Sequence, residues 1–178
     1  MKPQKRPTFM PDFKLDKAKA KAALLYIATN VTAIDEHKLY KILYFAEQKH
    51  LVQYGRPITG DAFIKMPFGP VPSYLRDRIC NNIEPDNSFL KNGILIIPNE
   101  YPDEDELSQS DIECLNESIE ENKSLTFFQL RDKSHQLAWN SASNSGRMDT
   151  LNIAKEGNAS EGILNYIIEN LENNLPIY

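Results

Sequence analysis

The sequence has few cysteines, few glycines and no long apolar run. Its two cysteines, Cys80 and Cys114, are far apart and lack the CxxC spacing typical of metal ligands, so we expect neither a disulfide nor a metal site. Apolar runs such as residues 22–28 and 94–97 are far shorter than the roughly 20 residues that span a bilayer. No secretory signal follows the charged first residues. These absences predict a cytoplasmic protein with no membrane partner and no cofactor.

The short motifs of common catalytic sites are also absent: HExxH, the P-loop, GxGxxG and GxSxG. Ser134 and His135 are adjacent on a predicted helix, where neighbouring side chains point about a hundred degrees apart, so they cannot form a nucleophile and base pair with each other. His37 and His50 lie near opposite ends of another predicted helix, too far apart to share a metal. The acidic residues 102–106 lack the glycine and terminal glutamate of an EF-hand. We therefore predict no enzyme activity, no catalytic residue and no metal.

Charge is unevenly distributed along the chain. The formal net charge is −5, which argues against a general binder of nucleic-acid phosphates. Residues 2–21 nevertheless carry seven basic and two acidic side chains, whereas residues 100–121 carry ten acidic side chains and no basic one. Solvated surface explains the basic run, and the acidic run is the better candidate for contact with a partner.

The length of 178 residues, 41 % of them hydrophobic, fits one domain with a packed core. Three prolines make residues 1–12 an extended basic arm, and residues 13–178 form the domain. Asp35 resembles a helix N-cap, and Ser108 with Asp111 approximates a capping box. The predicted helices are residues 16–30, 35–55, 73–82, 108–122, 126–140 and 158–172.

Two segments show strand-like patterns, residues 58–66 and residues 94–97, and an Asn92-Gly93 turn precedes the second. The prolines and glycine that follow residue 66 argue against further pairing, so residues 68–72 are predicted as a stiff corner. We expect a mainly helical α+β domain with five or six helices. A small antiparallel ribbon of two or three strands would pair residues 58–66 with residues 94–97.

Helical periodicity divides residues 35–55 into two faces. The predicted core face consists of Leu39, Ile42, Leu43 and Ala46. The predicted outer face carries Tyr40, Lys41 and Tyr44, although packing of Tyr44 between helices is an equally good interpretation.

The helix predicted over residues 126–140 has two neighbouring stripes of side chains. One stripe consists of Phe127, Leu130, Ser134 and Leu137, and the other of Phe128, Arg131, His135 and Trp139. A tryptophan on an amphipathic helix is expected to be mostly buried.

Four segments, in this order, resemble the Panacea domain family of SocA-like antitoxins from bacteria and phages. They are Lys38-Leu39-Tyr40-Lys41-Ile42-Leu43-Tyr44-Phe45-Ala46, then Gly60-Asp61-Ala62-Phe63, then Phe68-Gly69-Pro70-Val71, and finally Leu130, Ser134-His135 and Trp139. The resemblance covers residues 16–140. It implies structural roles for Leu43, Phe45, Gly60, Phe63, Leu130, Ser134 and Trp139.

The resemblance implies an antitoxin that binds and neutralises a toxin protein encoded beside it. Some family members carry an added DNA-binding domain, for which this chain has no room. The residues expected to bind the partner are Tyr40, Lys41, Tyr44, Lys65, Phe68, Gly69, Pro70, Val71 and His135. A transcriptional regulator or phage-associated DNA-binding protein, and an enzyme that uses His135, are the alternatives. The toxin, the manner of neutralisation (occlusion or delivery to a protease) and the oligomeric state, including a homo-oligomer, stay open.

Overall fold

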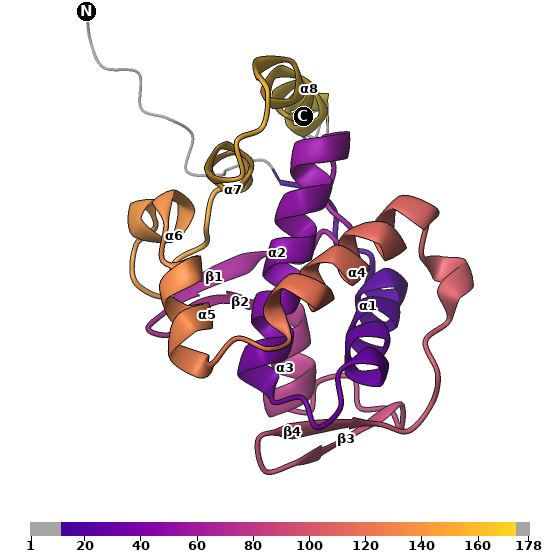
Figure 1. Ribbon diagram of the computed structural model, residues 1–178. Helices are drawn as coiled ribbons and strands as arrows, with labels where there is room; N and C mark the ends of the chain where they lie inside the picture. Colours follow the sequence, from indigo (N-terminus) through magenta and orange to yellow (C-terminus); the bar gives the residue numbers. More distant parts are fainter. Residues whose placement is uncertain (1–11, 174–178) are drawn as a thin grey trace, which may run out of the picture.

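The computed structural model describes residues 12–173, and residues 1–11 of the predicted basic arm lie outside this range. Within it, eight α-helices and two small antiparallel sheets form a mainly helical α+β domain, as predicted (Figure 1). The helices are α1 (Lys17–Asn30), α2 (Glu36–Tyr54), α3 (Ser73–Cys80), α4 (Gln109–Asn122), α5 (Phe127–Ser134), α6 (Leu137–Ser141), α7 (Thr150–Glu156) and α8 (Glu161–Asn173). The strands are β1 (Phe63–Met66), β2 (Gly69–Pro72), β3 (Phe89–Asn92) and β4 (Leu95–Pro98), and a short 3₁₀ helix covers Glu104–Glu106.

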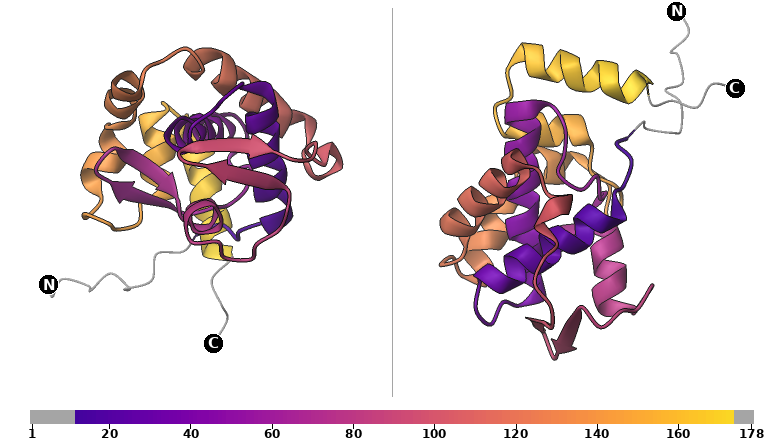
Figure 2. Two further views of the ribbon diagram at one scale, coloured as in Figure 1. Left: turned by 90° about the horizontal axis from the view of Figure 1, so that it is seen from below. Right: turned by 90° about the vertical axis from the view of Figure 1, so that its right-hand side faces the viewer.

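Helix α2 runs through the middle of the molecule (Figures 1 and 2). It contacts α1 and α4, strand β2 and α5, and α7 and α8. Every residue from 39 to 47 is therefore buried, and this part of the helix has no outer face. The predicted outer position of Tyr40, Lys41 and Tyr44 is wrong, because neighbours cover the helix on all sides.

The predicted helix starts are confirmed where a side chain caps the helix. The Asp35 carboxylate accepts a hydrogen bond from the Lys38 backbone N–H at 2.7 Å. Ser108 and Asp111 form a complete capping box at the start of α4. These local contacts require only neighbouring residues, which explains why the sequence reveals them.

The predicted pairing of the strands is wrong. Strand β1 pairs with β2, and β3 pairs with β4, so each strand forms a hairpin with its neighbour in sequence. The predicted stiff corner is largely strand β2. Pro70 and Pro72 are two residues apart and so occupy equivalent positions in the pairing pattern, which allows both to lack an N–H without breaking the hairpin.

The helix predicted over residues 126–140 is interrupted. Helix α5 ends at Ser134, and the backbone of His135 (φ −87°, ψ 63°) leaves the helical region before α6 begins. This break, together with α7, explains why there are more helices than the five or six predicted. In the described part of the chain, no helix has the length and apolar character needed to cross a membrane.

Candidate protein-interaction site

The four segments that carry the family resemblance converge on one side of the molecule. There the N-terminal half of α2, the β1–β2 hairpin, α5 and α6 lie together (Figure 1). The Trp139 indole N–H donates to the Met66 carbonyl at 2.9 Å and so fastens α6 to the hairpin. Lys41 donates from Nζ to the Pro70 carbonyl at 3.0 Å and fastens α2 to strand β2.

Gly69 lies where α2, β2 and α5 meet. Its φ is +111°, which favours glycine, and a Cβ atom there would lie 2.5 Å from both Lys41 Cε and Ser134 Oγ. Only a residue without a side chain allows this approach. Gly69 is therefore a packing position, buried together with Pro70 and Val71, and these three residues present no side chain to solvent.

The α2 residues predicted to bind a partner make internal contacts instead. Lys41 is completely buried, and burial lowers its pKa to about 7, against the opposing attraction of Asp35. The Tyr44 hydroxyl is buried and donates to the Glu156 carboxylate at 2.8 Å. The Tyr40 hydroxyl lies 3.7 Å from Cys80 Sγ. These three residues can position the site, but a rigid partner has no access to them.

Three of the predicted residues do reach the surface. Phe68, in the turn of the β1–β2 hairpin, is 54 % exposed. Lys65 is half-buried, with its Nζ 4.2 Å from the centre of the Trp139 ring. His135 stacks on the same ring, with centroids 3.7 Å apart. Trp139 is partly exposed but packs against the hydrophobic core, which agrees with the prediction that it is mostly buried.

Ser134 and His135 show no arrangement for nucleophilic catalysis. Ser134 is fully buried, and its hydroxyl donates to the Arg131 carbonyl at 2.9 Å. Burial lowers the pKa of His135, as do the nearby positive charges of Arg131 and Lys41. The Nε2 atom of His135 is buried and has no hydrogen-bond partner in the described part of the chain. The ring packs on Trp139.

Exposed aromatic side chains form a group beside this site, of which the sequence had indicated only Phe68 as a partner-binding residue. We define the aromatic patch as His37, Phe68, Phe127, Phe128 and Arg131. The exposed fractions of Phe68, Phe127 and Phe128 are 54, 38 and 61 %. A signal for the patch was present in the sequence: α5 buries Leu130 and Ser134, so two consecutive phenylalanines at its start cannot both join that buried stripe.

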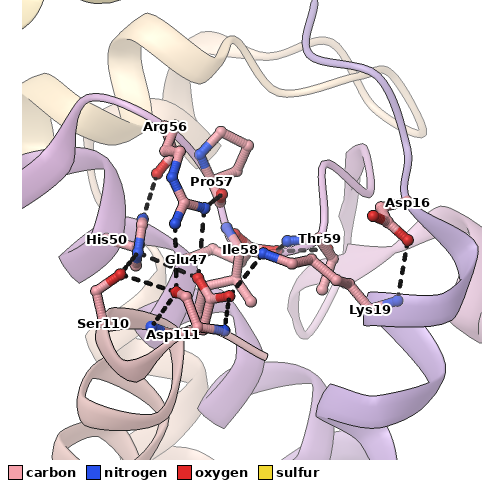
Figure 3. A network of polar contacts seen from close by, with 11 residues as sticks. Asp16, Lys19, Glu47, His50, Arg56, Pro57, Ile58, Thr59, Ser110 and Asp111 are labelled. Atoms are coloured by element: carbon pink, nitrogen blue, oxygen red, sulfur yellow. Dashed lines mark hydrogen bonds and ion pairs between the residues drawn. The ribbon is translucent and has the colours of Figure 1, made fainter. Parts of the chain in front are cut away.

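A second polar cluster, at the C-terminal half of α2, contains serine, histidine and aspartate (Figure 3). His50 Nε2 lies 2.9 Å from Ser110 Oγ and 3.2 Å from Asp111 Oδ1, while its Nδ1 lies 2.7 Å from the Arg56 carbonyl. A catalytic triad needs the serine and the carboxylate on different ring nitrogens. Here both are on Nε2, so the histidine cannot relay a proton between them.

The same cluster buries two carboxylates that are fully supplied with donors (Figure 3). Asp111 accepts from Lys19 Nζ at 2.6 Å and from the Ser108 N–H at 2.9 Å. Glu47 accepts from the N–H groups of Ile58 and Thr59 at 2.5 and 2.9 Å, and also from the Thr59 hydroxyl at 2.5 Å. Burial raises the pKa of Glu47 to about 7, although these donors oppose the rise. The contacts join α1, α2 and α4, which indicates a structural network.

A cleft of about 440 Å³ opens between α2, α4, α5 and α7. Its lysines already have partners: Lys49 is 2.8 Å from Glu121, and Lys133 donates to Asn122 Oδ1 at 2.6 Å. Among residues 12–173, no group of three or more histidine, cysteine or acidic side chains is placed to hold a metal ion. The two lysines of the cleft are therefore engaged in internal contacts.

The family comparison agrees with the convergence of these segments. A family model described as "Antitoxin SocA-like, Panacea domain" matches residues 39–140, more than half of the chain. No curated protein and no solved structure matches the sequence. The matched range contains α2 from Leu39 onward, both hairpins, α4 and α5, and nearly all of α6. The chain belongs to the SocA-like Panacea-domain antitoxin family.

Proposed function

We propose that this protein is an antitoxin that neutralises a toxin encoded beside its gene through direct protein contact in the cytoplasm. Family membership is the observation that carries the proposal. The rigid surface around the aromatic patch supports it, because large exposed side chains held by their neighbours are efficient anchors for a protein partner.

Within this proposal the predicted partner-binding residues have two roles. Lys65, Phe68 and His135 are the contact residues, since each reaches or borders the surface. The buried residues position them: they are Tyr40, Lys41, Tyr44, Gly69, Pro70 and Val71. The protein acts by binding and not as an enzyme. This proposal is supported by the packing of His135 on Trp139 and by the hydrogen bond of the Ser134 hydroxyl to the Arg131 carbonyl.

Co-expression tests the function. The product of the adjacent gene is induced alone and together with this protein, and growth is measured. We expect the adjacent product to arrest growth, this protein to restore it, and the two to co-purify as a stable complex. Failure of the wild-type protein to bind or to rescue growth would refute the proposal. Loss of both upon Lys65→Glu, in a protein that remains folded, is expected if Lys65 is a contact residue.

A gel-shift measurement with the protein's own promoter, at two salt concentrations, tests the alternative of a DNA-binding regulator. Specific binding that persists at the higher salt concentration, without any effect on growth arrest, would favour that alternative.

A further inference from the structure

The aromatic patch, defined above, joins three elements that are distant in sequence. His37 lies in the first turn of α2, Phe68 in the β1–β2 turn, and Phe127, Phe128 and Arg131 on α5. These elements are close together at the same end of the molecule in Figure 1. The patch therefore forms only in the folded protein, at the point where the family segments converge.

Contacts within the patch hold its side chains in place. The His37 ring stacks on Phe127 with centroids 4.0 Å apart, and its Nε2 lies 3.1 Å from the Phe68 carbonyl oxygen. Phe127 also makes edge contacts with Phe68 and Phe128, with centroids 5.2 and 5.3 Å apart. The Arg131 guanidinium lies 4.8 Å from the centre of the Phe128 ring. Rings fixed in this way lose little conformational entropy when a partner binds.

The patch does not form part of the hydrophobic core. Helix α5 supplies the core through Leu130, which is fully buried, whereas Phe128 on the same helix is 61 % exposed. A cluster of exposed phenylalanines held in contact is unusual for a surface that faces only water. It is typical of the apolar centre of a protein interface.

The segments that build this side of the molecule are basic, although the whole chain is acidic. Residues 35–41, 65–72 and 123–142 together carry six lysines or arginines and three acidic residues, whereas the whole chain has a formal net charge of −5. Two of these cations are partly exposed: Arg131, which lies over the Phe128 ring and has 32 % of its side chain exposed, and Lys123, four residues before Phe127 in the chain, with 42 %. Their ion pairs with Asp132 and Glu120 are exposed, and such pairs contribute little to stability.

We propose that the aromatic patch is the docking site for a segment of the toxin that carries an apolar anchor side chain flanked by carboxylates. The anchor covers Phe127 and Phe128, and the carboxylates pair with Arg131 and Lys123. The charge of the surface favours this occupant, because an acidic partner gains attraction there while a basic partner is repelled. The proposal rests on the proposed antitoxin function and adds the site and the chemistry of contact.

Two variants and two matched controls test the site with the product of the adjacent gene. Phe128→Ala removes an exposed anchor, and Arg131→Glu reverses a charge. Tyr101→Ala removes a ring that is 86 % exposed and belongs to a different region, and Lys155→Glu makes the same charge change on α7. We expect each patch variant to raise the Kd at least about 10-fold in isothermal titration, and each control to leave it within about twofold. Circular dichroism melting curves verify that all four variants are folded.

Salt dependence separates the charged contact from the apolar one. The affinity of the wild-type protein for its partner should fall as salt rises from 50 to 500 mM, because salt screens the attraction between exposed charges. The affinity of Arg131→Glu should depend less on the salt concentration. Patch variants that bind like wild type, or controls that are as weak as the patch variants, would overturn the proposal.

A peptide selection covers the case in which the adjacent gene product does not bind, which by itself refutes the proposed function. Random 12-residue peptides displayed on phage are selected against the wild-type protein and against the Phe128→Ala, Arg131→Glu double variant. We expect peptides with an aromatic or large aliphatic residue and several carboxylates, retained only by wild type. The docking site would be refuted if the selected peptides were neutral or basic, if the double variant captured them equally well, or if no peptide was enriched. A preference for single-stranded DNA in a parallel titration would also refute it.

Discussion

Both halves of α2 bury a charged side chain, but the two side chains differ in how many hydrogen bonds they make. In the C-terminal half, the Glu47 carboxylate accepts three hydrogen bonds from Ile58 and Thr59. In the N-terminal half, Lys41 donates one hydrogen bond, to the Pro70 carbonyl. His135, near Lys41, has a buried Nε2 with no partner among residues 12–173. Because buried polar groups are normally paired, the surroundings of the N-terminal half are less completely satisfied than those of the C-terminal half.

This difference parallels the two roles that the proposed function gives to the two halves of α2. The C-terminal network connects α1, α2 and α4 and leaves its carboxylates well supplied with donors. The N-terminal half lies next to the aromatic patch, where exposed rings and incompletely paired polar groups both reduce stability. Proteins retain such departures from good packing mainly where function requires them. Under the proposed function, the C-terminal half is the scaffold and the N-terminal half supports the contact surface.

The largest effect is expected from breaking the C-terminal network with Glu47→Ala. The substitution leaves two backbone N–H groups and a hydroxyl without an acceptor, and each unsatisfied buried donor costs about 1–3 kcal/mol. It also opens a cavity. We expect the free energy of unfolding to fall by about 4 kcal/mol in urea denaturation. Glu117→Ala, at a side chain that is 52 % exposed, is the control and should cost less than about 0.5 kcal/mol. A loss below about 1 kcal/mol at Glu47 would contradict the structural role.

A smaller loss is expected from Trp139→Ala, which detaches α6 from the hairpin. The side chain is half-buried, so the expected destabilisation is about 3 kcal/mol, at the lower end for large aromatic residues. Trp139→Phe keeps a ring beside His135 but removes the hydrogen bond to Met66, and should cost about 1 kcal/mol. Equal losses for the two variants would show that the ring contributes no stability through packing.

Local features of the sequence predicted the helix starts and the family segments, and tertiary arrangement decided the rest. Asp35 and the Ser108 box act within four residues, so the pattern alone reveals them. The burial of Lys41 depends on β2 and α5 covering α2, which no periodicity records. The exposure of Phe128 likewise depends on which face of α5 packs against the core, and the hydrophobicity of the residue alone does not reveal it.

The two buried charges of α2 should also respond to pH in opposite directions. The pKa of Glu47 is raised to about 7, so the folded state binds more protons than the unfolded state between about pH 4.5 and 7, and its contribution to stability falls as pH rises through that range. The pKa of Lys41 is lowered to about 7, so the unfolded state binds more protons between about pH 7 and 10.5, and stability rises with pH there. Each slope is at most about 1.4 kcal/mol per pH unit.

Difference curves isolate these slopes from those of other groups, such as His37, whose pKa is lowered to about 4 mainly by burial. Urea denaturation of wild type, Glu47→Gln and Lys41→Met is measured from pH 4.5 to 10. We expect Glu47→Gln to remove only the decline of stability with rising pH below pH 7. Lys41→Met should remove only the rise of stability above pH 7. The lowered pKa of Lys41 would be contradicted if the difference in the free energy of unfolding between wild type and Lys41→Met stayed constant from pH 7 to 10.

The smallest effect on stability is expected at the aromatic patch, from Phe128→Ala. The ring is 61 % exposed, so its removal should change the free energy of unfolding by less than about 0.5 kcal/mol. Leu130→Ala, at a completely buried position on the same helix, should cost about 3 kcal/mol. If the patch is a contact surface, Phe128→Ala should weaken partner binding although the variant is as stable as the wild type. A loss of stability at Phe128 comparable to that at Leu130 would instead assign the ring to the core, and the division between a supporting and a recognising half of α2 would fail.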